Sequence, residues 1–301
     1  MDQDQPPRRR SPPARRPPQP ATPPPRPRRD PSSPSQQSAA RSAEGHPPRR
    51  IEREFGVPIP GEILDPTQWT QTALKAWPNP GPLDWQSLFG RRAPVVLDIG
   101  CGNGRFILGS AWTRRDHDHL GVDTLPVVIR YARRRANQRG LSNVRFAVGG
   151  GLELVRDYVP PHSVAEIHVY HPQPYDGPDP ALAQRRLFTP EFAMLLHRAL
   201  QPGGLLVVQT DHPGYWDAIR HIAAGFFHLT ERIGPWPDAP RGRTRREIIA
   251  LRQGLRVYRA SGTPRTDLTE QDAAELVRTL PLPVFAPHRR SRALDRLDRG
   301  Y

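Results

Sequence analysis

The sequence predicts an α/β fold in which a doubly wound, mostly parallel sheet carries helices on both faces. Three observations support this fold class. From residue 94 onward, short apolar runs alternate with segments of helical periodicity. A glycine-rich loop, Gly100 to Gly104, directly follows the first apolar run. Two more strands are expected late in the chain, outside the alternation. Because each helix returns the chain to the same end of the sheet, the alternating strands are expected to be parallel.

The individual elements follow from apolar runs bounded by glycine, proline or polar residues. Parallel strands are expected at 95–99, 119–123, 143–148, 164–170 and 205–209. Helices are expected from 105, at 126–138, at 190–200 before a stop at Pro202-Gly203-Gly204, and at 215–224. The two late strands are expected at 226–231 and 256–260. Thr269 and Asp272 form a capping pair, which predicts a docked accessory helix over 269–280.

Composition divides the 301 residues into four segments. Residues 1–50 contain 15 Pro, 11 Arg and no aromatic residue, so a disordered basic arm is predicted. The arm is interpreted either as a nucleic-acid tether or as a tail without a function of its own. Residues 51–90 are expected to be an extended segment packed on the core, 91–261 the α/β domain, and 262–301 an accessory helix and tail.

Charge and cysteine content limit the possible partners and compartment. The net charge of +14 permits a polyanionic partner such as nucleic acid. The ratio of 43 Arg to 1 Lys also indicates a base-composition bias, so charge alone does not establish that partner. The single cysteine, Cys101, excludes a disulfide framework and a cysteine-based zinc site. With no long apolar run and no secretory leader, a cytoplasmic protein without membrane contact is expected.

The glycine loop and two aspartates indicate a nucleotide-type cofactor. Gly100, Gly102 and Gly104 follow a strand directly, where glycine lets the backbone approach a ligand. Asp98 lies inside that strand, and Asp123 ends the next one, where its carboxylate can accept both hydroxyls of a ribose. The spacing is G-x-G-x-G rather than the dinucleotide G-x-G-x-x-G. A nicotinamide dehydrogenase also places an acid about 20 residues on, so Asp123 alone does not decide between them.

Asp98-Ile99-Gly100-Cys101-Gly102-Asn103-Gly104 resembles the first motif of the class I S-adenosylmethionine-dependent methyltransferases. That class has a Rossmann-like, seven-stranded sheet with one antiparallel strand, which agrees with the two late strands expected here. The resemblance implies S-adenosyl-L-methionine as the cofactor, held by Asp98, Gly100, Gly102, Gly104 and Asp123.

Further stretches between about 90 and 260 resemble the tRNA (guanine-N7-)-methyltransferase family. The shared order and spacing carry this resemblance more than any single stretch. The matching stretches are Leu97 to Phe106, Gly121-Val122-Asp123, Leu141 to Arg145, His171-Pro172-Gln173-Pro174-Tyr175, Arg185-Arg186-Leu187, Leu200 to Gly204, Thr210-Asp211, and Arg243-Thr244-Arg245-Arg246-Glu247.

The resemblance implies methyl transfer to guanine N7 in tRNA, at position 46 of the variable loop. Guanine N7 has an in-plane lone pair and no proton, so no general base is required. Asp211 and Glu247 are then expected to accept from the Watson–Crick edge, and Thr244 to add a hydroxyl. Gln173 and Asp211 are assigned catalytic roles, and Gly177 is assigned to the substrate site. Phosphate contacts are expected from the basic Arg130–Arg139 helix, from Arg185 and Arg186, and from the Arg241 to Arg246 segment, in which Arg245 and Arg246 are expected to reach phosphate. The arm over 1–50 is a further candidate for these contacts.

Two departures from the family pattern affect these expectations. Gln173 stands where the family has an acid, so binding is expected to survive while charge stabilisation falls. Gly150 stands at the acidic position after the third strand, and a backbone carbonyl or Glu153 is the expected substitute toward adenine. Gly150 and Gln173 are nevertheless kept as cofactor-site positions.

Several alternatives remain open at this stage. Thr210-Asp211 can cap the next helix, and Thr244 to Glu247 can be a solvated loop. No metal site is expected, because no other ligands stand at metal spacing around His171. The departures also allow a methyltransferase for a small molecule or protein, or a non-catalytic RNA-binding relative. The sequence leaves the oligomeric state undetermined.

Overall fold

The computed structural model describes residues 51–78 and 81–298. The predicted disordered arm over 1–50 lies outside the described residues. One seven-stranded sheet organises the rest, in the order β5-β4-β3-β6-β7-β9-β8. Its strands are β3 (Val95–Ile99), β4 (Asp118–Asp123), β5 (Val144–Val148), β6 (Val164–Tyr170), β7 (Leu200–Thr210), β8 (Phe227–Glu231) and β9 (Tyr258–Pro264).

Strand direction confirms the mostly parallel sheet. Strands β3 to β7 pair in parallel, whereas β9 runs antiparallel to both β7 and β8. The carboxyl ends of the five parallel strands therefore meet at one edge, where open α/β sheets bind their ligands.

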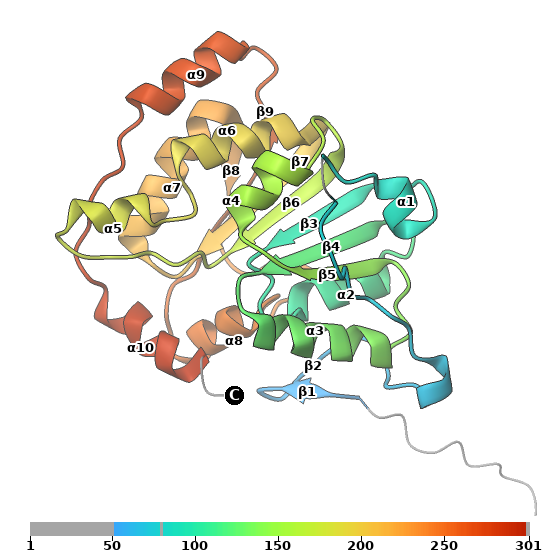
Figure 1. Cartoon of the computed structure of the whole chain (residues 1–301). Helices are drawn as coiled ribbons and strands as arrows, with labels where there is room; N and C mark the ends of the chain where they lie inside the picture. Colours follow the sequence, from blue (N-terminus) through green and yellow to red (C-terminus); the bar gives the residue numbers. More distant parts are fainter. Residues whose placement is uncertain (1–50, 79–80, 299–301) are drawn as a thin grey trace, which may run out of the picture. The chain divides into compact units, whose positions relative to one another are not determined.

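Helices cover both faces of the sheet (Figure 1). Helices α2 and α3 enclose one apolar cluster, and η2, α6 and α7 enclose a larger one. The capping pair of Thr269 and Asp272 is confirmed at the start of α9. The helical elements are η1 (Pro66–Gln68), α1 (Trp85–Phe89), α2 (Arg105–Thr113), α3 (Pro126–Gln138), α4 (Gly151–Glu153), η2 (Leu154–Tyr158), α5 (Pro180–Gln184), α6 (Pro190–Ala199), α7 (Pro213–Phe226), α8 (Arg245–Arg252), α9 (Glu270–Thr279) and α10 (Arg289–Asp298).

The structure differs from the sequence prediction in several places. Residues 200–204 belong to β7, because Leu200 pairs with Val164 and the register then shifts so that Leu205 pairs with Glu166. Pro202-Gly203-Gly204 is therefore a bulge within a strand and not the stop of a helix. The hairpin of β1 (Arg53–Glu54) and β2 (Val57–Pro58), and helices α8 and α10, were not expected.

Candidate active site

A cavity of about 690 Å³ lies at the carboxyl edge of the parallel strands. The segments after β3, β4, β5 and β6 line it, together with residues from the start of α8 and the end of α10. It contains twelve of the residues expected from the sequence, which are Asp98, Gly100, Gly102, Asp123, Gly150, Glu153, Gln173, Arg185, Arg186, Thr244, Arg245 and Arg246. Gly104, Gly177, Asp211 and Glu247 lie outside this lining.

The glycine loop is held to the end of β4. The Asp123 carboxylate accepts hydrogen bonds from Gly102 N–H (3.0 Å) and Leu125 N–H (2.9 Å), while burial raises its pKa. Gly102 has φ +52 and Gly104 has φ +79, which favour glycine. A Cβ on Gly104 would lie 2.8 Å from the Cβ of Ala132, so this glycine lets α2 pack against α3.

Asp98 is a buried carboxyl with one unpaired oxygen. Its residue is 2% exposed, and its Oδ1 has no hydrogen-bond partner among the described residues. Burial, helped by the negative charge of Asp123, raises its pKa well above the usual range. An unpaired buried polar atom costs free energy. Because Asp98 lines the cavity, the amino group of a cofactor's amino acid portion fits this position.

After the carboxyl end of β5, one carboxylate is available to the adenine of a cofactor. The Gly150 carbonyl accepts from Leu154 N–H (3.0 Å), so it is already used within its own turn. Glu153 is exposed, lines the cavity, and its carboxylate folds over Gly150. Of the two substitutes expected from the sequence, Glu153 is the group with a carboxylate facing the cavity. Leu125 and Val128 provide apolar surface beside it.

Gln173 follows β6 and lines the cavity with an exposed side chain. No hydrogen bond to its amide is found among the described residues, so both amide atoms remain available to a ligand. Two positions earlier, His171 has φ +49, a backbone conformation that residues other than glycine rarely adopt. This strained turn carries the chain from the sheet edge into the wall of the cavity.

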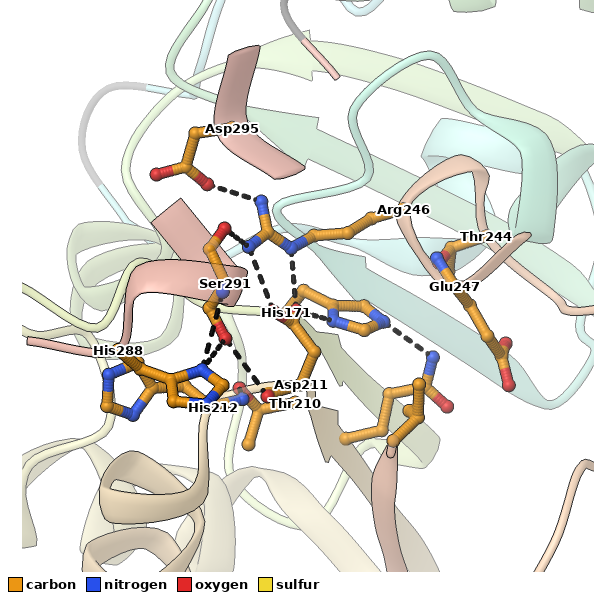
Figure 2. Close-up of polar contacts among 12 residues, drawn as sticks. His171, Thr210, Asp211, His212, Thr244, Arg246, Glu247, His288, Ser291 and Asp295 are labelled. Atoms are coloured by element: carbon orange, nitrogen blue, oxygen red, sulfur yellow. Dashed lines mark hydrogen bonds and ion pairs between the residues drawn. The ribbon is translucent and has the colours of Figure 1, made fainter. Parts of the chain in front are cut away.

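Asp211 lies behind that wall in a chain of hydrogen bonds (Figure 2). The Trp236 indole N–H can only donate, and it donates to Gln209 Oε1 (2.8 Å), which fixes the orientation of the amide. Gln209 Nε2 therefore donates to His171 Nε2 (2.9 Å), and His171 Nδ1–H donates to Asp211 Oδ1 (2.8 Å). The imidazole hydrogen of His171 thus lies on Nδ1.

Arg246 completes the set of partners of Asp211. Its Nε donates to Oδ1 (2.7 Å) and its Nη2 to Oδ2 (3.1 Å). Burial opposes ionisation of Asp211, but the hydrogen bonds and charges of His171 and Arg246 hold its pKa well below the usual range. His212, and not Asp211, caps α7, because its side chain accepts from Tyr215 N–H. The alternative of a helix cap at Asp211 is therefore wrong.

Both arginines expected to reach phosphate are engaged within the protein. Arg246 uses four of its five N–H groups, since Nη1 also donates to Asp295 Oδ1 (2.5 Å) and Nη2 to the Ser291 carbonyl (3.2 Å). Arg245 donates to Asp298 Oδ1 (3.1 Å) and to Glu54 of the β1–β2 hairpin (3.4 Å). This geometry corrects the expectation of two free phosphate ligands.

Thr244 and Glu247 form the start of α8 and not a solvated loop. The Thr244 hydroxyl accepts from Glu247 N–H (3.1 Å), which is a helix N-cap. Glu247 is fully buried, its Oε1 accepts from Arg259 (2.5 Å), and its Oε2 accepts from Arg243 N–H (2.7 Å). In Figure 2 its carboxylate points away from the Asp211 cluster. Glu247 therefore does not present its carboxylate to a base in this geometry.

Gly177 is not among the lining residues of the cavity. Its N–H donates to the Phe285 carbonyl (3.0 Å), in the segment that leads to α10. The preceding Asp176 is buried and accepts from Arg292 and from His288 N–H, which anchors α10 further. Gly177 thus supports the C-terminal segment, and its assignment to the substrate site stays a prediction.

The arginines expected on the phosphate-facing side divide into two groups. Arg135 and Arg139 are buried and pair with Glu52, and Arg186 is buried against main-chain carbonyls. Exposed arginines of the expected set are Arg130, Arg134, Arg185 and Arg241. Sequence periodicity could not separate the two groups, because the partners of the buried arginines lie far away in the chain.

The sheet order, the glycine loop at its carboxyl edge and the two aspartates define a class I S-adenosylmethionine-dependent methyltransferase. A family described as putative methyltransferase matches residues 92–260. The chain belongs to the tRNA (guanine-N7-)-methyltransferase family of these enzymes.

Individual relatives extend this comparison. A tRNA (guanine-N(7)-)-methyltransferase of Halorhodospira halophila is 33% identical over 204 residues, covering 64% of this chain and 87% of that protein. One from Bordetella pertussis is 34% identical over 182 residues, covering 60% and 70% respectively. Among solved structures, the 16S rRNA methyltransferase KamB is 19% identical with a TM-score of 0.48, covering 64% of this chain and 98% of that one.

Neither a candidate metal site nor a helix able to span a membrane is found among the described residues. No group of three or more His, Cys, Asp or Glu side chains in this part of the chain is placed to hold a metal ion. None of its helices is long and apolar enough to cross a membrane.

Proposed function

We propose that this protein transfers a methyl group from S-adenosylmethionine to guanine N7 in tRNA, at position 46 of the variable loop. The observation that carries the proposal is the convergence of the family-matched segments after β3, β4, β5 and β6 on a single cavity. The names of the relatives support guanine N7 in tRNA as the acceptor, and position 46 is the finer part of this proposal, implied by the family resemblance of the sequence. The tRNA partner is consistent with the basic charge of the chain.

The cofactor residues are proposed from chemistry and position. Asp98 would accept from the amino group of the methionine portion, and Asp123 would accept from the ribose hydroxyls. The loop from Gly100 to Gly104 lets the backbone approach the ligand, and Glu153 takes the place of the missing acid at Gly150. When bound there, S-adenosylmethionine supplies an electrophilic methyl group. The cavity fits it, because Asp98 Oδ1 has no hydrogen-bond partner and no hydrogen bond to the Glu153 carboxylate is found among the described residues.

The acceptor side needs orientation more than acid–base chemistry. Guanine N7 carries a lone pair and no proton, so the protein has no proton to remove. Correct alignment of reacting groups contributes up to about 7–11 kcal/mol to lowering a barrier. Gln173, whose amide is free, would accept from or donate to the base beside the reacting atom. Asp211 would act as a positioning residue, because it holds His171 and Arg246, which line the cavity, in place.

The exposed arginines Arg130, Arg134, Arg185 and Arg241 are the proposed phosphate contacts. Arg130 and Arg134 project from α3, whose N-terminal part borders the cavity at Leu125 and Val128. Contacts of this kind position a nucleic acid without reading its sequence.

The test is methylation of bulk unmodified tRNA by the full-length protein with methyl-labelled S-adenosylmethionine, followed by nucleoside mass spectrometry. Label in 7-methylguanosine is the expected result. Cofactor binding without 7-methylguanosine would contradict the proposed acceptor, and absence of cofactor binding would contradict an enzymatic role. A substrate with guanosine 46 replaced by adenosine, which should lose the label, tests the position.

A further inference from the structure

Helix α10 forms part of the cavity wall, although it lies beyond the family-matched residues 92–260. Leu294 is 1% exposed and packs in an apolar cluster with Ile249 and Leu255. The Ser291 hydroxyl donates to the Asp211 carbonyl (3.1 Å), and Arg292 donates to Asp176 (2.9 Å). These contacts fix α10 across the acceptor side of the cavity.

The two acids expected to read guanine are buried and already engaged within the protein. Asp211 accepts from His171 and twice from Arg246, and Glu247 accepts from Arg259 and from the backbone of Arg243. Their residues are 3% and 0% exposed, and neither lines the cavity. A base in the cavity would therefore find neither carboxylate available.

Asp295, unlike these two acids, has a carboxylate that a ligand in the cavity can reach. Its side chain lines the cavity and is 19% exposed. One oxygen, Oδ1, is held by Arg246 Nη1 at 2.5 Å, and its other oxygen accepts no hydrogen bond from the described residues. Figure 2 shows Arg246 between Asp295 and Asp211, so the arginine that engages Asp211 also holds Asp295. The ion pair with Arg246 thus fixes the Asp295 carboxylate, and its second oxygen can still accept a hydrogen bond from a ligand.

We infer that Asp295 is the carboxylate that selects guanine in this protein. Guanine presents N1–H and N2–H side by side, and a carboxylate accepts from both. Asp295 therefore replaces Asp211 and Glu247 as the acceptor on the Watson–Crick edge. This inference rests on the proposed function, because it names how the acceptor site of that reaction distinguishes its base.

The test compares tRNA with guanosine or inosine at the methylated position, because inosine lacks only the N2 amino group. The quantity measured is the ratio of kcat/KM for guanosine to that for inosine. For the wild-type protein a ratio of about 10 or more is expected, since a lost hydrogen bond to a charged group has that effect. For Asp295→Asn and Asp295→Ala, the ratio should fall to near 1. A change that merely loosens the fold lowers both rates and leaves the ratio unchanged.

Two further variants make the result specific. Ser291→Ala removes a contact of α10 with the core, and it should leave the wild-type ratio intact. Asp298→Asn tests the other α10 carboxylate on the cavity, which pairs with Arg245. The inference is overturned if both Asp295 variants keep the wild-type ratio, or if the ratio falls to near 1 only in Asp298→Asn. Either result is compatible with the formation of 7-methylguanosine, so the proposed function is unaffected. No 7-methylguanosine from wild-type protein overturns the proposed function and this inference together.

Discussion

Arg246 and Asp211 form an ion pair of two hydrogen bonds behind the cavity, with Nε 2.7 Å from Oδ1 and Nη2 3.1 Å from Oδ2. The pair joins the start of α8 to the end of β7. Through Asp295 and the Ser291 carbonyl, the same guanidinium also holds α10. One arginine therefore connects three elements of the acceptor wall.

Replacing Asp211 by alanine should destabilise the fold. The change leaves the partly buried guanidinium of Arg246 with one carboxylate instead of two, and it removes the acceptor of His171. Breaking a buried ion pair from one side costs several kcal/mol, so we expect the free energy of unfolding to fall by about 3 kcal/mol. Urea denaturation measures it. Asp217→Ala, which breaks an exposed pair with Arg220, is the matched control and should cost less than about 1 kcal/mol. Equal losses in the two variants would contradict the assignment of Asp211 as an anchor.

Asp98→Asn should weaken cofactor binding without weakening the ligand-free fold. A hydrogen bond to a charged group contributes about 1.5–3 kcal/mol, so calorimetry should show a 10- to 100-fold loss of affinity for S-adenosylmethionine. The unfolding free energy of the ligand-free protein should stay constant or rise, because a buried carboxyl without a partner on Oδ1 is removed. Asp118→Asn is the control, since this buried acid pairs with Arg91 at the amino end of β4. The Asp118→Asn control should lose stability and keep its affinity for S-adenosylmethionine. If Asp98→Asn instead lost stability and kept its affinity, the assignment of Asp98 to the cofactor site would be wrong.

Gln173→Asp should accelerate methyl transfer. An ionised carboxylate beside the base opposes the positive charge that develops on the purine, whereas the amide of Gln173 does so only through its dipole. Charged hydrogen bonds exceed neutral ones by about 1 kcal/mol, so a roughly fivefold rise in the single-turnover rate is expected. Gln201→Asp introduces the same charge at an exposed position outside the cavity and should have no effect. A slower Gln173→Asp enzyme would show that the position requires a donor.

Salt dependence should separate the exposed arginines of α3 from the buried ones. Arg130→Gln and Arg134→Gln should each weaken tRNA binding and reduce the slope of log affinity against log salt by about 1. Arg135→Gln should instead lower stability, because it breaks the ion pair with Glu52. Arg278→Gln on α9 serves as the control for an exposed arginine outside the proposed surface. Unchanged slopes for Arg130 and Arg134 would exclude α3 from the tRNA contact surface.

The sheet and the cofactor half of the site could be predicted because their signals are local. Each parallel strand is an apolar run bounded by breaking residues, as at Val95–Ile99 before Gly100. When a glycine loop directly follows a β-strand, the loop must lie at the edge of the sheet. The positions of Asp98, just before the loop, and Asp123, at the end of the next strand, can then be predicted as well. Continuous local patterns of this kind depend little on the rest of the chain.

The acceptor half could not be predicted, because its polar contacts join distant residues. Arg246 lies 35 residues from Asp211 and 49 from Asp295, and Asp176 lies 116 from Arg292. Whether an arginine is a free phosphate ligand or a buried anchor depends on such tertiary partners. Helix α10 gave only a weak sequence signal, because Leu294 is the single buried apolar side chain in an otherwise arginine- and aspartate-rich segment. Its apolar partners belong to α8 and to the segment between α8 and β9.

The most direct test of methyl transfer to N7 uses tRNA in which the guanosine at position 46 is replaced by 7-deazaguanosine. This base keeps the Watson–Crick edge and exchanges only N7 for a carbon without the lone pair. We predict that the full-length protein binds this tRNA with the affinity of the unmodified molecule and transfers no methyl group to it, while the guanosine form is methylated. Methyl incorporation into the 7-deazaguanosine tRNA equal to that of the guanosine form would contradict attack by N7 at this position.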